Sequence, residues 1–266
     1  MKGRKLFNVI LGLLAVLMIF ITGCSTKEQQ LSDMDTWDML WLSDSSGWVV
    51  TDIYAGFIEE DNDVKVNVTS NYSFSVGEIL QGLKGEQESS HFLLKNLSER
   101  IAESEVIVIY GNPEDSVDPS NPWDFNCGQS SLNNCYVNNC SMDSFSQYIS
   151  DLEEIYSLIF QIRKGKPTII RAIDAYNPHL VSHCLPDGAF EECVACWENY
   201  NTAMHEAADK MGVPIAHVFD AWNGVDHTEN PVEKGYTEED NEHPSELGAT
   251  VTAQLLREIG YEPIIP

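Results

Sequence analysis

Short apolar runs alternate with amphipathic stretches along most of this chain, a pattern that predicts strands separated by helices. Runs typical of buried strands cover 39–42, 64–68, 106–110, 166–171 and 213–218. Helical spacing of apolar residues covers 48–58, 75–84, 88–103, 143–163, 190–212 and 244–260. This alternation predicts βαβ units, and therefore a mainly parallel sheet covered by helices on both faces. Ligands of such sheets bind beyond the carboxyl ends of the strands.

The last predicted helix has the clearest boundaries. Pro244 suits its first turn, and Gly260 suits its end. The spacing predicts one apolar face, which would carry Leu247, Val251, Leu255 and Ile259. A polar loop through residue 239 precedes this helix.

The first 24 residues read as a targeting segment rather than part of the fold. Lys2, Arg4 and Lys5 precede an almost wholly apolar run that ends at Ile21. Small residues and then Cys24 follow, which resembles a bacterial lipobox in which Cys24 is lipidated. The alternative is an uncleaved anchor, for which the run is at the short limit. Either alternative predicts an extracytoplasmic chain held to a membrane, with a tether at 25–35 and a single domain at 36–266.

The charge is strongly negative, which excludes some partners. The chain has 42 acidic and 15 basic residues, a net charge of −27. Nucleic-acid binding needs a basic patch, so we expect no nucleic-acid partner. The simplest interpretation is a solvated extracellular surface.

Six further cysteines agree with export, because they are even in number and fall in two loop-like stretches. As disulfide candidates we name Cys127, Cys135, Cys140, Cys184, Cys193 and Cys196. The sequence does not choose their pairing. The alternative is a zinc site made by Cys193 and Cys196 with His183 or Cys184.

Two short motifs, far apart in the chain, contain candidate catalytic residues. Ser45 follows the first strand in a turn that leads into a helix, where it either exposes its hydroxyl or only caps the helix. Asp240 and His243 precede the last helix, and an Asp three residues before a His can hold Nδ1–H while Nε2 faces a serine. On the predicted strand pattern, both motifs fall on the same rim of the sheet.

A third motif, Gly111-Asn112, follows the strand at 106–110. An Asn amide there can donate to an oxyanion, and a Gly permits close backbone approach. The alternative is an ordinary Asn-Pro turn.

Together these motifs resemble the SGNH, or GDSL-type, hydrolase family over most of residues 37–260. Ser43-Asp44-Ser45 matches the family's Gly-Asp-Ser, with Ser45 as the nucleophile. Gly111-Asn112 matches its Gly-x-Asn without the middle residue, and Asp240 with His243 matches its Asp-x-x-His. The resemblance implies a three-layer α/β/α sandwich of the flavodoxin-like kind and a Ser45–His243–Asp240 triad. It also implies an oxyanion hole of Ser45, Asn112 and a second-block backbone N–H.

The sequence departs from the family pattern around that hole. Ser43 replaces the first glycine, which predicts an altered turn. Gly77 is the nearest candidate for the second-block donor, and Ser73 or Ser75 are alternatives because the donor is a backbone group.

The remaining histidines have simpler interpretations. His217 falls in the strand predicted at 213–218, His205 falls in a helix, and Asp226-His227 is a weaker imitation of a catalytic pair. Aromatic residues of the loops either line a substrate cleft or pack around disulfides: Trp123, Tyr136, Trp197 and Trp222.

The resemblance implies a serine ester hydrolase without metal or organic cofactor. Its expected substrate is a small ester or an acylated saccharide. Two alternatives stay open: a non-catalytic ligand-binding lipoprotein on the same fold, and a zinc-stabilised module built on the cysteines.

Overall fold

The structure, a computed structural model, describes residues 31, 34–72, 75–85, 95–111, 141–180, 184 and 190–266. All elements discussed below belong to one unit, Thr36–Pro266. Within the described residues, no helix combines the length and the apolarity that a bilayer span requires. The segment at 1–24 that is predicted to be a targeting segment lies outside the described residues, as do three of the cysteines, Cys127, Cys135 and Cys140.

A parallel sheet of five strands forms the centre of the unit, in the order β2-β1-β3-β4-β5. The strands are β1 (Thr36–Leu42), β2 (Lys65–Asn71), β3 (Val106–Tyr110), β4 (Ile169–Ile173) and β5 (Ile215–Ala216). Because β1 pairs with both β2 and β3, the segments that follow these three strands leave the sheet side by side. The predicted mainly parallel α/β fold is confirmed.

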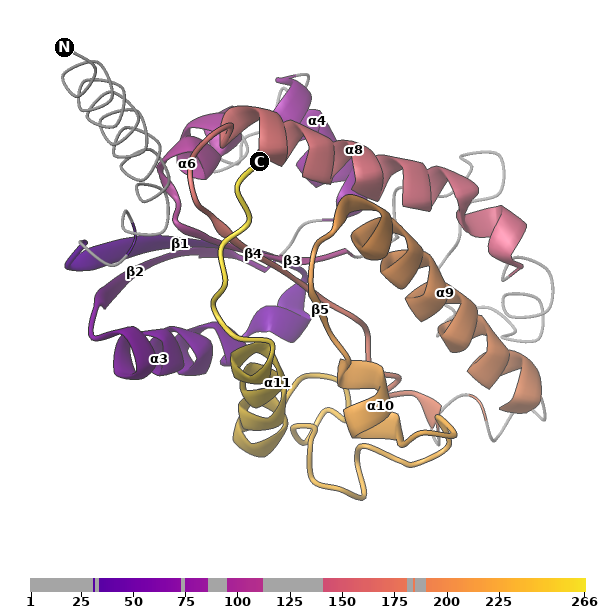
Figure 1. The fold of residues 1–266 in the computed structure, drawn as a ribbon. Coiled ribbons are helices and arrows are strands. Elements are labelled where there is room, and N and C mark those ends of the chain that lie inside the picture. Colours follow the sequence, from indigo (N-terminus) through magenta and orange to yellow (C-terminus); the bar gives the residue numbers. More distant parts are fainter. Residues whose placement is uncertain are drawn as a thin grey trace, which may run out of the picture. The chain divides into compact units, whose positions relative to one another are not determined.

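Helices cover both faces of the sheet (Figure 1). One face carries α3 (Val50–Asn62) and α11 (Glu246–Glu258), with α10 (Val218–Asn223) beside α11. The other face carries α4 (Val76–Lys84), α6 (Leu97–Glu103), α8 (Ser146–Ile162) and α9 (Phe190–Met211). Two 3₁₀ turns, η1 (Ser45–Gly47) and η2 (Met142–Phe145), precede α3 and α8. The result is the three-layer arrangement.

The strands β1, β3 and β4 are largely buried because both faces of the sheet are covered, whereas the edge strand β2 is more polar and more exposed. Alternate residues such as Leu40, Ile107 and Ile170 join the core beneath α4, α6, α8 and α9. The residues between them face α3 and α11: Trp41 of β1, for example, meets Tyr54 of α3 edge-on.

Arg171 of β4 ties the C-terminal segment to this second face. Its side chain is buried, and Nη2 donates to the carbonyls of Gly260 at 2.7 Å and Glu262 at 3.1 Å. Thr168 and Ile264 add an antiparallel bridge. The chain beyond α11 is therefore fixed along β4, which also fixes the position of α11.

Several predicted boundaries were wrong around β5 and α11. The strand predicted at 213–218 is only two residues long, and His217 lies outside it, as the residue that precedes α10. The polar loop contains α10, which hydrophobic spacing did not predict. Pro244 precedes the N-cap Ser245 instead of lying in the first helical turn.

The buried face of α11 also differs from the predicted one. Leu247 is 53% exposed, and the helix instead buries Ala249, Thr252, Ala253 and Leu256. Gly248 explains the difference, because a Cβ there would lie 2.1 Å from the Tyr236 carbonyl oxygen. Small residues let α11 approach its neighbours closely, so the helix buries its small residues and not the large apolar ones that the spacing predicted.

Two of the disulfide candidates are paired. Cys184 and Cys193 form a disulfide, and Cys196 is also disulfide-bonded. In the structure these three cysteines are therefore cross-links and not the ligands of the alternative zinc site.

Candidate active site

The turn after β1 places Ser45 at the carboxyl edge of the sheet. Asp44 precedes the 3₁₀ turn as its N-cap, and its Oδ1 accepts the backbone N–H of Ser46 at 2.8 Å. Because β1 lies between β2 and β3, the segments that carry Gly77 and Gly111 leave the sheet on either side of Ser45.

Ser43 does not distort this turn, although its sequence position predicted an altered one. Its backbone does not have a positive φ, so no glycine is required there. Its buried hydroxyl accepts the indole N–H of Trp41 at 3.0 Å and donates to the Asp44 carbonyl at 2.7 Å. Gly47 provides the space, since a Cβ there would lie 2.2 Å from Ser43 Oγ.

The chain then reverses through a tight γ-turn centred on Val49. Val49 has φ 67° and ψ −40°, and the N–H of Val50 donates to the Trp48 carbonyl at 2.8 Å. Positive φ is unfavourable for a β-branched residue, and this kind of γ-turn is rare and strained. Backbone strain is therefore held four residues from Ser45, a pattern found at functional sites.

The loop before α11 fixes the position of His243. The backbone N–H of Glu238 donates to the His243 carbonyl at 2.8 Å, and Thr237 pairs with Pro244 in an antiparallel bridge. Asn241 adopts φ 61°, a conformation that asparagine tolerates better than most residues. The imidazole is thus presented from a closed loop.

Ser45, His243 and Asp240 form a continuous hydrogen-bonded chain. Ser45 Oγ lies 2.9 Å from His243 Nε2, and Asp240 Oδ2 lies 2.6 Å from His243 Nδ1. The other carboxylate oxygen, Oδ1, accepts the backbone N–H groups of Glu242 at 2.9 Å and His243 at 3.0 Å. Asp240 is thereby oriented by the backbone and by the imidazole together.

The pKa of Asp240 lies below its ordinary value. Burial alone would raise the pKa, but hydrogen bonds from the Glu242 N–H and from the His243 ring and N–H lower it more. Asp240 is therefore ionised at neutral pH, and its negative charge lies beside the imidazole of His243. This arrangement can take a proton from Ser45 and stabilise the imidazolium that results.

Tyr176 supports the same loop, although no sequence pattern predicted this role. Its hydroxyl donates to the Glu242 carbonyl at 2.8 Å, while its ring stacks on Trp222 with centroids 3.8 Å apart. Trp222 and Trp197 are both buried, so they pack in the interior and do not line an open cleft. Trp123 and Tyr136 lie outside the described residues.

The predicted oxyanion donors are only partly described. Gly77 is the second residue of α4, so its N–H has no acceptor within the helix. The N–H of Ser75 already donates to the Glu78 carboxylate at 3.1 Å, which leaves Gly77 as the better donor candidate. Asn112 and Ser73 lie outside the described residues.

Gly111, at the end of β3, is held by two buried tyrosines. Its carbonyl accepts the hydroxyls of Tyr148 at 2.8 Å and Tyr200 at 2.6 Å. Burial raises the pKa of both phenols well above 10, so both remain neutral donors. A Cβ at Gly111 would lie 2.9 Å from the Tyr148 oxygen, which accounts for glycine there.

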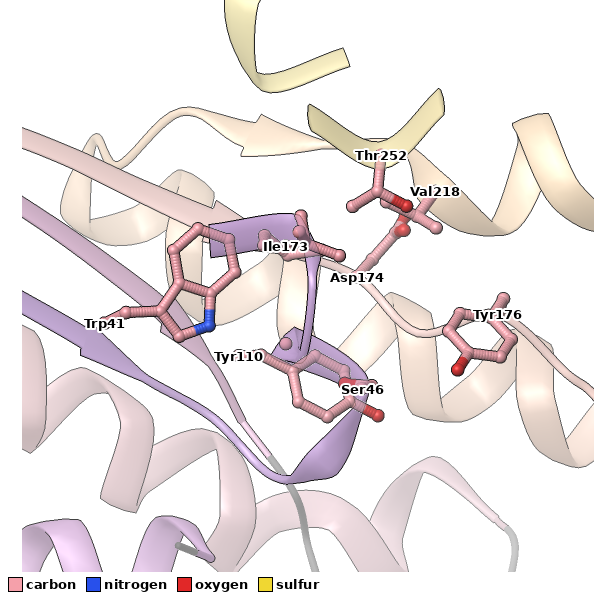
Figure 2. Close-up of a pocket in the computed structure, with 10 residues that line it drawn as sticks. Trp41, Ser46, Tyr110, Ile173, Asp174, Tyr176, Val218 and Thr252 are labelled. Carbon is pink, nitrogen blue, oxygen red and sulfur yellow. The ribbon is translucent and has the colours of Figure 1, made fainter. Parts of the chain in front are cut away.

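A small, mainly apolar cavity of about 10 Å³ lies behind the Ser45 turn (Figure 2). Figure 2 shows Trp41 at one end of it and Tyr176 at the other, with Ser46 and Asp174 between them. Its remaining lining residues are Gly47, Val50, Tyr110, Ile173, Val218 and Thr252. Neither Ser45 nor His243 lines this cavity.

Three other histidines lie in two separate clusters. His205 and His217 gather around the buried Asp174, a set that could hold a metal ion. His227, considered with Asp226 as a rival pair, instead contacts Glu198 at 3.0 Å and Asp220 at 2.9 Å.

Comparison with known proteins identifies the fold but not a family. Neither a protein-family model nor a curated protein matches the chain. Among solved structures, an alpha/beta hydrolase enzyme from the metagenome of Lake Arreo matches with TM-score 0.54 at 11% identity, covering 85% of this chain and 96% of that one.

Two more solved structures are similar over the same extent. An acetylxylan esterase from Geobacillus stearothermophilus matches with TM-score 0.53 at 14% identity, covering 85% of this chain and 95% of its own. Phospholipase A1 from Streptomyces albidoflavus NA297 matches with TM-score 0.51 at 13% identity, covering 85% and 99%. At these identities the likeness shows a shared α/β fold.

Proposed function

We propose that this protein is a serine ester hydrolase of the SGNH type. The observation that carries the proposal is the Ser45–His243–Asp240 chain, with contacts of 2.9 Å and 2.6 Å at the carboxyl edge of a parallel sheet. These are the contacts that acyl transfer through a serine nucleophile requires. The similar solved structures include an acetylxylan esterase and a phospholipase, which supports the same reaction class.

In the proposed reaction, Ser45 Oγ attacks the ester carbonyl while His243 Nε2 takes its proton. Asp240 keeps Nδ1 protonated and stabilises the imidazolium. The tetrahedral oxyanion is stabilised by the N–H groups of Ser45 and Gly77 and by the Asn112 amide. His243 then gives its proton to the leaving alcohol, and a water activated by the same nitrogen cleaves the acyl-enzyme.

The proposed substrate is a small ester or an acylated saccharide outside the cytoplasm. The apolar run before Cys24 and the net charge of −27 motivate a lipid anchor and an extracytoplasmic location. Metabolic labelling with a radioactive fatty acid tests the anchor, because Cys24→Ser should abolish incorporation. Equal labelling of wild type and variant would contradict the assignment.

The nucleophile is tested with full-length protein in detergent. Wild type should hydrolyse a short-chain nitrophenyl ester and react with a fluorophosphonate at Ser45. Ser45→Ala should lose both, with activity falling by a factor on the order of 10⁶ or to background. Ser150→Ala, which alters an exposed serine on α8, is the matched control and should keep both activities.

A wild-type protein that neither hydrolyses esters nor reacts with the fluorophosphonate would refute the enzyme proposal. That result would favour the non-catalytic ligand-binding alternative on the same fold.

A further inference from the structure

We propose that Asp174, His205 and His217 form a binding site for one divalent transition-metal ion of the zinc type. The site is separate from the triad, and the inference does not depend on the proposed ester hydrolysis. The three residues come from different elements: the segment after β4, the middle of α9 and the residue before α10. A bound ion would therefore join three parts of the sheet's second half.

The distances among the three ligand atoms suit a tetrahedral ion. Asp174 Oδ2 lies 2.9 Å from His205 Nε2 and 3.9 Å from His217 Nδ1. One ligand atom from each residue can be chosen so that all three lie within 4.8 Å of one another. With bonds of about 2.0–2.1 Å, tetrahedral ligand atoms are about 3.3 Å apart, between the two distances given above. Small side-chain movements would complete the geometry.

The carboxylate is already held in the orientation that such a site needs. Asp174 is 2% exposed, and its Oδ1 accepts the backbone N–H of Phe219 at 2.9 Å. This leaves Oδ2 directed at the two imidazoles, as an outer hydrogen bond does for ligands of known metal sites. Figure 2 shows Asp174 at the wall of the cavity behind the Ser45 turn.

The two imidazoles differ in exposure, which gives the ion a route in. The His205 side chain is 29% exposed and the His217 side chain 56% exposed. Their rings meet edge to face, with centroids 4.9 Å apart and planes at 74°. Water can thus reach the site and supply a fourth ligand, an arrangement known for zinc with three protein ligands.

The donor set and the local charge select the class of ion. Two imidazole nitrogens favour zinc, copper, nickel or cobalt over magnesium or calcium, which prefer oxygen ligands. Besides Asp174, the carboxylates of Asp209 and Asp220 lie close enough to His205 to act on it electrostatically. Negative charge therefore surrounds the cluster, and it attracts a cation as well as a proton.

The simpler alternative is an Asp174–His205 hydrogen bond with His217 as a bystander. The two interpretations differ at His217. In the hydrogen-bonded pair, His217 contributes little because it lies 3.9 Å from Asp174 and is more than half exposed. In the metal site, His217 is one of three ligands. Replacing His217 therefore separates the two interpretations without disturbing buried structure.

The test uses full-length protein in detergent, treated with a chelator and then freed of it. Cobalt(II) is titrated first, because tetrahedral Co²⁺ absorbs visible light far more strongly than the hydrated ion. Zinc affinity is then measured by competition with a chromophoric chelator. The variants are His205→Gln and His217→Gln. His227→Gln is the histidine control, because its ring stacks on Phe219 and its ring nitrogens contact Glu198 and Asp220, which are not among the three proposed ligands.

We expect one tetrahedral Co²⁺ per chain in wild type and in His227→Gln. His217→Gln and His205→Gln should each weaken zinc binding at least about tenfold. Zinc should raise the thermal unfolding midpoint of wild type but not that of His217→Gln. The proposal is overturned if wild type binds zinc no more tightly than the His205→Gln/His217→Gln double variant, or if His227→Gln weakens binding equally. None of these measurements uses ester hydrolysis, so the metal-site proposal can fail while the ester-hydrolase proposal stands, and the reverse.

Discussion

Replacing Asp240 by asparagine should inactivate the proposed triad through the tautomer of His243. The backbone N–H groups of Glu242 and His243 both donate to Asp240 Oδ1, at 2.9 Å and 3.0 Å. In Asp240→Asn, these donors require an acceptor, so the amide oxygen takes the Oδ1 position. The amide NH₂ then takes the Oδ2 position, 2.6 Å from His243 Nδ1 in the wild-type structure.

An NH₂ group at that position can only donate, so Nδ1 must become the acceptor and the ring proton must move to Nε2. A protonated Nε2 cannot take the proton of Ser45, to which it lies 2.9 Å away. The expected loss in kcat is about 10⁴-fold, or about 5.4 kcal/mol in the barrier. Asp240→Ala removes the charge without forcing this tautomer, so it should be impaired no more than Asp240→Asn.

The assay is kcat for a short-chain nitrophenyl ester, measured beside the thermal unfolding midpoint. The midpoint should change little, because the Asp240 side chain is 48% exposed and asparagine keeps both backbone hydrogen bonds. Fluorophosphonate labelling of Ser45 should slow in parallel with kcat. Activity of Asp240→Asn within tenfold of wild type, in a folded protein, would refute this reasoning and the role given to Asp240.

Two further predictions concern stability. Gly47→Ala should lower the free energy of unfolding by roughly 1–3 kcal/mol or more in a denaturant titration, because its Cβ would lie 2.2 Å from Ser43 Oγ. The control Gly56→Ala, which has open space around its Cβ and a helical backbone, should be neutral or stabilising by up to about 1 kcal/mol. Equal effects of the two substitutions would contradict the packing described for the turn. The free energy of unfolding should fall as pH rises above about 10, because unfolded phenols titrate there while burial holds the pKa of Tyr148 and Tyr200 well above that value. The unfolded state then binds fewer protons than the folded one, so each such tyrosine lowers the free energy of unfolding by up to about 1.4 kcal/mol per pH unit. In denaturant titrations between about pH 9 and pH 11, the free energy of unfolding of Tyr148→Phe should therefore decline less steeply than that of wild type.

The sheet was predictable because its strands are marked by apolar runs that no loop would tolerate. The strand predicted at 106–110 coincides with β3, and the helix predicted at 190–212 differs from α9 by one residue. The failures fall where burial depends on contacts from distant segments. β5 is only two residues long, and α11 buries small residues against Tyr236 and Trp222 in place of its larger apolar ones.

In the candidate site, too, local contacts were predictable and contacts between distant segments were not. Asp240 and His243 are close in sequence, so their contact follows from a tight loop, whereas their contact with Ser45 depends on the strand order. The supporting residues carried no local signal. Tyr148 and Tyr200 come from different helices, and both donate to the Gly111 carbonyl. His217 was assigned to a strand, and its place beside Asp174 required the register of β4 and β5.

The contact between Ser45 and His243 joins residues 198 positions apart in the chain. During synthesis the nucleophile emerges early, and its proton acceptor emerges only with the loop that precedes α11. Nascent chains that lack this loop hold no complete Ser45–His243–Asp240 chain. A proteolytic cut between α10 and α11 that releases the C-terminal piece would likewise silence Ser45 without touching it. The proposed triad is therefore complete only when both ends of the unit are in place.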